Sequence, residues 1–156
     1  MPVEQRGFES FAKVLKKSPT LVRREVGKAL KNAVTVVGLA AKTNIPTGAT
    51  GALKRSVVSH VDEQDMIGIV GLDAPGRQYG IFVEKGTKPH WVPKAALERW
   101  AAQRNIPVYA VQRAIARKGT KPQPFMRPAF ENNKSFINRQ FTLAHTRIVT
   151  SLTNGN

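Results

Sequence analysis

Hydrophobic residues recur every three or four positions along most of the first 45 residues, which is the spacing of an amphipathic helix. The pattern predicts a short helix over residues 8–17, a break at Ser18–Pro19, and a long helix over residues 20–43, because proline favours the first turn of a new helix. Most Lys and Arg residues of the long helix lie off its apolar stripe, so we expect the stripe to face the core. The stripe consists of Val22, Val26, Leu30, Ala33, Val37 and Ala40.

From residue 56 the pattern changes to short runs rich in β-branched residues. Residues 56–61 and 66–71 predict two paired strands joined by the acidic turn at residues 62–65, and residues 79–84 predict a third strand. Because an isolated hairpin is marginally stable in water, we expect one face of this sheet to pack on the long helix.

The second half of the chain returns to helical spacing. It predicts a helix that begins at Pro93, a break at Ile106–Pro107, a second helix up to residue 117, and a last helix over roughly residues 127–150. The inward stripe of the last helix is Phe130, Ile137, Phe141, Ala144 and Ile148. The fold class is therefore α+β, as one domain over residues 1–156: a small antiparallel sheet of three or more strands on a long N-terminal helix, a helical hairpin inserted at 88–121, and a C-terminal helix.

Charge is distributed unevenly along a chain whose formal net charge is +15. Residues 1–58 hold eleven Lys/Arg against three acids, residues 59–84 one against five, and residues 85–127 ten against one. A basic surface attracts nucleic acid through counterion release. The same pattern also suits a subunit whose basic face meets an acidic neighbour, and both interpretations remain open.

The sequence offers no constellation typical of catalysis or of metal binding. Cysteine is absent, so disulfides and thiolate metal sites are excluded. His60, His90 and His145 have no ligand partner at metal spacing, and neither Ser56 nor Ser59 lies in a nucleophile elbow. No apolar run approaches the roughly 20 residues that span a bilayer. We therefore expect a soluble, non-catalytic protein without catalytic, cofactor-binding or metal-binding residues and without a membrane partner.

Glycine turns and prolines mark the stretch from residue 79 to residue 129. The five residues Lys-Gly-Thr-Lys-Pro occur twice, beginning at Lys85 and at Lys118, and this arrangement is typical of a structural joint. Gly51 and Gly86 are expected to adopt backbone conformations closed to residues with a Cβ. Glu84 has three interpretations at this point: a salt bridge between subunits, a cap on the glycine turn, or an exposed acid.

Two residues near the end of this stretch are expected to position the last helix. We expect Phe125 to be a core anchor in preference to an exposed docking residue. Pro128 suits the first turn of the helix that follows.

Three blocks of the sequence, taken in order, resemble the small head–tail joining proteins, also called tail-completion or neck proteins, of long-tailed bacteriophages. The first is the long helix followed by Pro46 and residues 50–57; the second is Tyr79-x-x-x-Val83-Glu84-x-Gly86-Thr87; the third is Pro124-Phe125-Met126-Arg127-Pro128-Ala129. The resemblance covers most of residues 20–140. Family members usually pass from the second block to the third through a short loop, and here residues 88–121 intervene.

The resemblance implies a structural virion protein, made in the host cytoplasm, that forms a homo-oligomeric ring around the DNA channel. Its partners would be the connector or head-closure proteins on one side and the tail terminator or tube proteins on the other. We expect a free monomer, since no long apolar stripe is left over after the core is assigned, and a possible contact with channel DNA. The candidate interface residues are Glu84, Lys85, Lys88, Arg117 and Lys118. The alternatives are a basic nucleic-acid-binding protein and a minor component of the tail.

Overall fold

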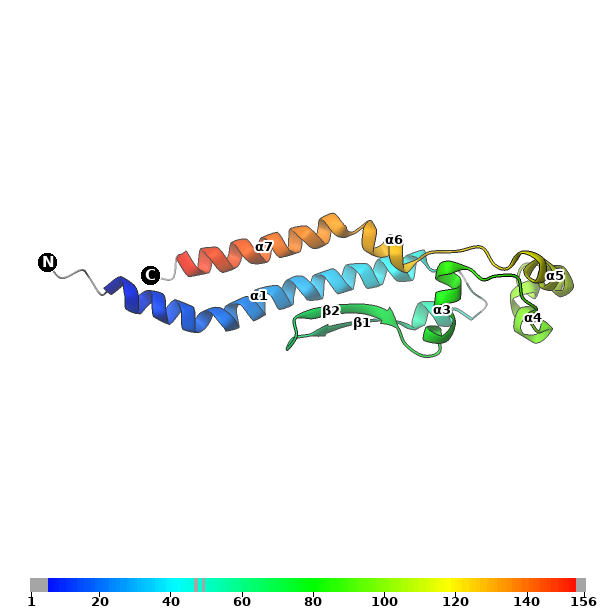
Figure 1. The fold of residues 1–156 in the computed structure, drawn as a ribbon, viewed down its shortest axis with the longest axis horizontal. Coiled ribbons are helices and arrows are strands. Elements are labelled where there is room, and N and C mark those ends of the chain that lie inside the picture. Colours follow the sequence, from blue (N-terminus) through cyan, green and yellow to red (C-terminus); the bar gives the residue numbers. More distant parts are fainter. Residues whose placement is uncertain (1–5, 47, 49, 154–156) are drawn as a thin grey trace. The chain divides into compact units, whose positions relative to one another are not determined.

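The computed structural model describes residues 6–46, 48 and 50–153, with side chains from residue 18 onward. It is an α+β structure, as predicted (Figure 1). The elements are α1 (Arg6–Asn44), α2 (Ala52–Arg55), β1 (Val57–Asp62), β2 (Ile67–Leu72), α3 (Gly76–Lys85), α4 (Lys94–Ala102), α5 (Val108–Lys118), α6 (Met126–Glu131) and α7 (Lys134–Thr153). The described residues form two compact units: one drawn from residues 6–36, 59–69 and 133–153, the other from residues 37–46, 48, 50–58 and 70–132.

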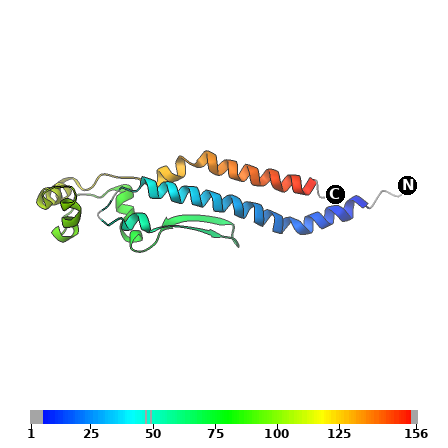
Figure 2. The ribbon, with the colours of Figure 1, turned by 180° about the vertical axis from the view of Figure 1, so that it is seen from behind.

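Helix α1 is one continuous helix, so the predicted break at Pro19 is wrong. A proline inside a helix removes one backbone hydrogen bond, costs about 3 kcal/mol and commonly bends the helix. Figures 1 and 2 show α1 bending within its blue N-terminal portion without ending there. The helix-forming residues on both sides of Pro19 therefore outweigh its local cost.

In the first unit, the β-hairpin packs on α1 through small residues. Ser59 donates a hydrogen bond from Oγ to the carbonyl oxygen of Val34, 3.2 Å away. A Cβ added to Gly68 would lie 2.7 Å from the Val34 side chain, so only glycine allows this approach. Because neighbouring residues of a strand point to opposite faces, Ile67 and Ile69 point away from α1, and they are 50% and 52% exposed.

The predicted stripe of α1 is only partly right. Leu30, Ala33 and Val37 are buried as expected, whereas Val22 is 37% exposed. The pattern missed Glu25, which is a charged residue and only 4% exposed.

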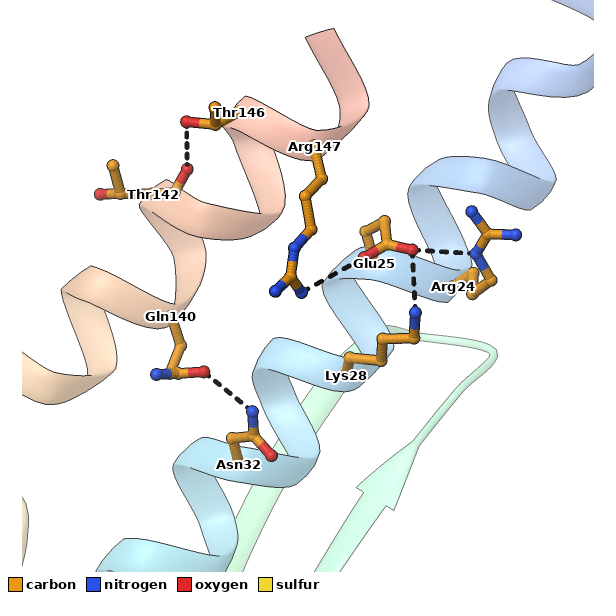
Figure 3. A network of polar contacts seen from close by, with 8 residues as sticks. All are labelled: Arg24, Glu25, Lys28, Asn32, Gln140, Thr142, Thr146 and Arg147. Atoms are coloured by element: carbon orange, nitrogen blue, oxygen red, sulfur yellow. Dashed lines mark hydrogen bonds and ion pairs between the residues drawn. The ribbon is translucent and has the colours of Figure 1, made fainter. Parts of the chain in front are cut away.

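A polar network joins α1 to α7 within the first unit (Figure 3). Arg24 and Lys28 donate to one carboxylate oxygen of Glu25 at 2.9 and 3.0 Å, and Arg147 of α7 lies 3.7 Å from the other. The hydrogen bonds from Lys28 and then Arg24 hold the pKa of Glu25 below its ordinary value of 4.5, against the opposing effect of burial. Near the middle of α1, the Asn32 side chain donates to Gln140 at 2.8 Å.

In the second unit, the segment predicted as a third strand is the helix α3, so among the described residues the sheet has two strands. The β-branched and aromatic residues of this segment suggested a strand. Two buried glycines one helical turn apart, Gly76 and Gly80, decide otherwise: an added Cβ would overlap Ser56 at the first and Leu72 at the second. Their bare surface lets α3 pack closely against these neighbours.

The remaining helices follow the prediction with one division. Helices α4 and α5 form the expected helical pair, separated at Pro107. The predicted last helix is divided into α6 and α7 at Asn132–Asn133, because asparagine competes for backbone hydrogen bonds and favours turns. Ala144 is buried as expected, but Phe130 is 48% exposed, contrary to prediction. No helix of the described residues is long and apolar enough to cross a membrane.

Candidate functional site

The two copies of Lys-Gly-Thr-Lys-Pro lie against each other, and their threonines form an antiparallel bridge. The Thr87 N–H donates to the Thr120 carbonyl at 3.1 Å, and the Thr120 N–H donates back to the Thr87 carbonyl at 3.3 Å. The two threonine hydroxyls are 3.0 Å apart and share a further hydrogen bond. The repeat therefore closes the base of the α4–α5 hairpin; we call this pairing the threonine clasp.

Both repeat glycines are required by the backbone of the clasp. Gly86 has φ 72° and ψ −177°, and Gly119 has φ 69° and ψ −159°. Residues other than glycine rarely adopt this region. A Cβ would also overlap the Thr120 carbonyl at Gly86 and the Thr87 carbonyl at Gly119. Gly51, the other glycine singled out from the sequence, has φ 64° and lies at the start of α2.

Glu84, in the last turn of α3, caps the start of α6. Its Oε2 accepts hydrogen bonds from the N–H groups of Phe125 and Met126 at 2.7 and 3.0 Å, and its Oε1 accepts one from the Arg127 N–H at 3.1 Å. The first turn of a helix has no intrahelical partners for its N–H groups, so a carboxylate is favourable there. Glu84 is half-buried, and its contact is with α6.

The charge state of Glu84 follows from this capping. Partial burial raises its pKa, and the three N–H donors, helped by the nearby Arg127 guanidinium, outweigh that effect. The net result is a pKa below the ordinary value of 4.5. Glu84 is therefore ionised at neutral pH, and its charge is engaged inside the subunit.

Phe125 and Pro128 fix where α6 begins. The Phe125 side chain is 1% exposed and is the largest fully buried side chain of the described residues. Its carbonyl accepts a hydrogen bond from the Asn44 side chain at 3.3 Å, which ties the end of α1 to this joint. Pro128 lies in the first turn of α6, where a proline needs no intrahelical hydrogen bond.

The four basic residues predicted at an interface, Lys85, Lys88, Arg117 and Lys118, are all exposed. Lys85 and Lys88 flank one arm of the clasp, and Arg117 and Lys118 end α5. On α5, Tyr109, Arg113 and Arg117 follow one another at four-residue steps and are all exposed, whereas Gln112 is buried. The structure thus brings the clasp and Glu84 together, and it adds an aromatic and cationic stripe on α5.

An open groove of about 530 Å³ lies beside the Glu84 cap. Its apolar lining includes Leu72, Ile81, Met126 and Phe130, and Arg77 and Arg127 also line it. Glu84 also lines the groove, but its carboxylate is hydrogen-bonded to the backbone at the start of α6. The groove therefore presents mainly apolar side chains and two arginines. We call it the motif groove, since most of its lining residues belong to the second and third blocks.

The described residues contain no group of three or more His, Cys, Asp or Glu placed to hold a metal ion. No protein-family model, no curated protein and no solved structure matches this chain.

The sequence identified the repeats, Glu84, Gly86 and Phe125 as candidates, but it did not predict which of them contact each other. The identical repeats were visible and could have indicated that the two segments pair with each other. The cap by Glu84 on a helix 41 residues further along left no local signal, because such a contact exists only in the folded chain.

Proposed function

We propose that this protein is a structural component of a phage particle that joins the head connector to the tail, as a ring around the DNA channel. The observation that supports it best is the joint between two of the three resembling blocks. Glu84 of the second block caps the helix that the third block opens. Two of the blocks that carry the resemblance therefore contact each other, and their contact is structural.

The exposed apolar side chains support a role in assembly. Several large hydrophobic residues are more than one-third exposed in each unit. They include Ile67, Ile69, Phe136, Leu143 and Val149 in the first unit and Ile81, Phe82, Trp91, Tyr109 and Phe130 in the second. Where exposed apolar residues lie on one face, as Ile67 and Ile69 do on β2, they suit a protein–protein contact, whereas single exposed ones are common on any protein surface. In a cyclic ring, many such contacts repeat and together give a joint stronger than any one of them.

The experiment that tests this function is electron microscopy of lysates from a phage in which the gene for this chain is inactivated. We expect DNA-filled heads beside separate, complete tails. Aberrant or missing tails with normal heads would indicate the minor tail component instead. Normal, infectious virions would contradict both roles.

The α5 stripe favours a second candidate function, binding of nucleic acid by the isolated subunit. Arg113 and Arg117 offer charges to phosphates, and Tyr109 offers a ring on which a base can stack. This candidate predicts tight binding to DNA, with an affinity that falls steeply as salt rises. The joining function predicts weak binding by the free subunit. Fluorescence anisotropy with labelled DNA over 50–200 mM salt, comparing wild type with the double variant Arg113→Ala/Arg117→Ala, separates the two.

A further inference from the structure

The outer face of the β-hairpin carries two large apolar side chains that the described residues leave about half exposed. Ile67 and Ile69 point away from α1 and are about half exposed, while the inner face is occupied by Ser59 and Gly68. The inner face also carries Val57, which is buried, so the exposed apolar side chains available to a partner on β2 are the two outer isoleucines. We call Ile67, Ile69 and the adjacent Asp65 the hairpin face.

Acidic residues border this face. Residues 59–69 contain three acids and no Lys or Arg. Asp62 accepts hydrogen bonds from the turn N–H groups of residues 64 and 65, and Glu63 forms an ion pair with Lys31 at 2.7 Å. Asp65 is exposed, and no ion pair described for this structure involves it. It lies in the turn that precedes β2, close in the sequence to the two isoleucines.

The motif groove has the complementary character. It is lined by apolar side chains, of which Ile81 and Phe130 are 48% exposed, and it is bordered by arginines. Arg77 is 3.8 Å from Asp73, and Arg127 is exposed and near the capped Glu84. Residues 85–127, the segment that contributes Phe125, Met126 and Arg127 to the groove, carry ten Lys/Arg against one acid. An occupant with an apolar face and an acidic border fits this groove.

We infer that the hairpin face of one copy of this chain docks in the motif groove of a second copy. The isoleucines would cover the exposed walls of the groove, and Asp65 would meet Arg127. The two surfaces are different, so the contact is heterologous, and such a contact gives a ring where the rotation between copies closes on itself. The inference rests on the proposed ring and identifies which surfaces would form it.

Cross-linking tests this contact directly, because the chain has no cysteine of its own. An Ile69→Cys variant with an affinity tag is mixed with an untagged Phe130→Cys variant and treated with a short bismaleimide at high protein concentration, so that a contact too weak to hold free monomers together is still trapped. We expect at least tenfold more cross-linked heterodimer than in the matched mixture of Ile69→Cys with Val149→Cys, since Val149 is also exposed but lies on α7. Equal yields in the two mixtures, or no heterodimer, would overturn the inference and leave the groove to another virion protein.

Charge reversal is a second, independent test of whether Asp65 and Arg127 face each other across the contact. Arg127→Glu in the Phe130→Cys chain should lower the yield about tenfold, because it places two acids opposite each other across the contact. Asp65→Arg in the Ile69→Cys chain should restore it. Both residues are exposed, and unchanged circular dichroism spectra and urea midpoints verify that the variants are folded. A yield that Arg127→Glu leaves unchanged, or that Asp65→Arg does not restore, would contradict the pairing.

The two levels of the account fail separately. If inactivating the gene leaves heads and tails unjoined but no cross-link forms, the joining function stands and this contact is wrong. If the cross-link forms but virions lacking the protein are normal, the contact stands and the joining function is wrong.

Discussion

Removal of the Glu84 carboxylate should destabilise the joint between α3 and α6. In Glu84→Ala, three N–H groups at the start of α6 lose their acceptor. Those of Phe125 and Met126 are part-buried, whereas that of Arg127 is exposed and can bind water. A lost hydrogen bond to a charged group that leaves a buried donor unpaired costs roughly 1–3 kcal/mol. Because both donors are only part-buried, each loss falls in the lower part of that range, and the two together lower the free energy of unfolding by about 2–4 kcal/mol.

The assay is urea denaturation followed by circular dichroism at neutral pH. With a urea dependence of about 2 kcal/mol per molar, the midpoint should fall by about 1–2 M. Glu98→Ala is the matched control, because Glu98 is an exposed acid on α4, and it should change stability by less than about 0.5 kcal/mol. If Glu84→Ala shifts the midpoint no more than Glu98→Ala does, the capping argument is refuted.

The pH dependence gives the same argument a second test. The pKa of Glu84 is lowered in the folded protein from 4.5, so its contribution is complete above the unfolded pKa and is lost as the pH falls through the folded pKa. The stability difference between wild type and Glu84→Gln should therefore be largest near neutral pH and shrink below about pH 4.5. A difference that grows on acidification would contradict the assigned direction.

Three further predictions concern other parts of the molecule. Gly86→Ala and Gly119→Ala should each destabilise the protein by about 1–3 kcal/mol or more, since both strain the backbone and overlap the clasp. The control Gly27→Ala, in open space on α1, should stabilise it by about 0.5–1 kcal/mol. Equal urea midpoints for the three variants would refute the clasp geometry. Replacement of residues 90–117 by two glycines should leave a cooperatively folding protein, because the clasp joins the cut ends; loss of the unfolding transition would show that the hairpin is not separable. Glu25→Gln should unfold at lower urea at pH 7, with a difference that shrinks below pH 4.5 because the pKa of Glu25 is lowered; a constant difference would contradict this.

The sequence was sufficient where local pattern decides the structure. The long first helix, the paired strands, the α4–α5 hairpin and the position of Phe125 follow from spacing, prolines and glycines. It misled where packing overrides propensity: residues 79–84 read as a strand, but Gly76 and Gly80 let a helix pack closely at that place. It could not give contacts between distant segments, such as Glu84 with Phe125, because these arise only when the chain folds.

The claim that this chain joins head and tail is tested most directly by cryo-electron microscopy of virions from the phage that encodes it, with mass spectrometry of the purified particles. We expect peptides of this chain in the virion, and a ring between connector and tail whose density fits α1, the β-hairpin and the α6 joint. Particles that lack the chain, or a neck formed entirely by other proteins, would contradict the account.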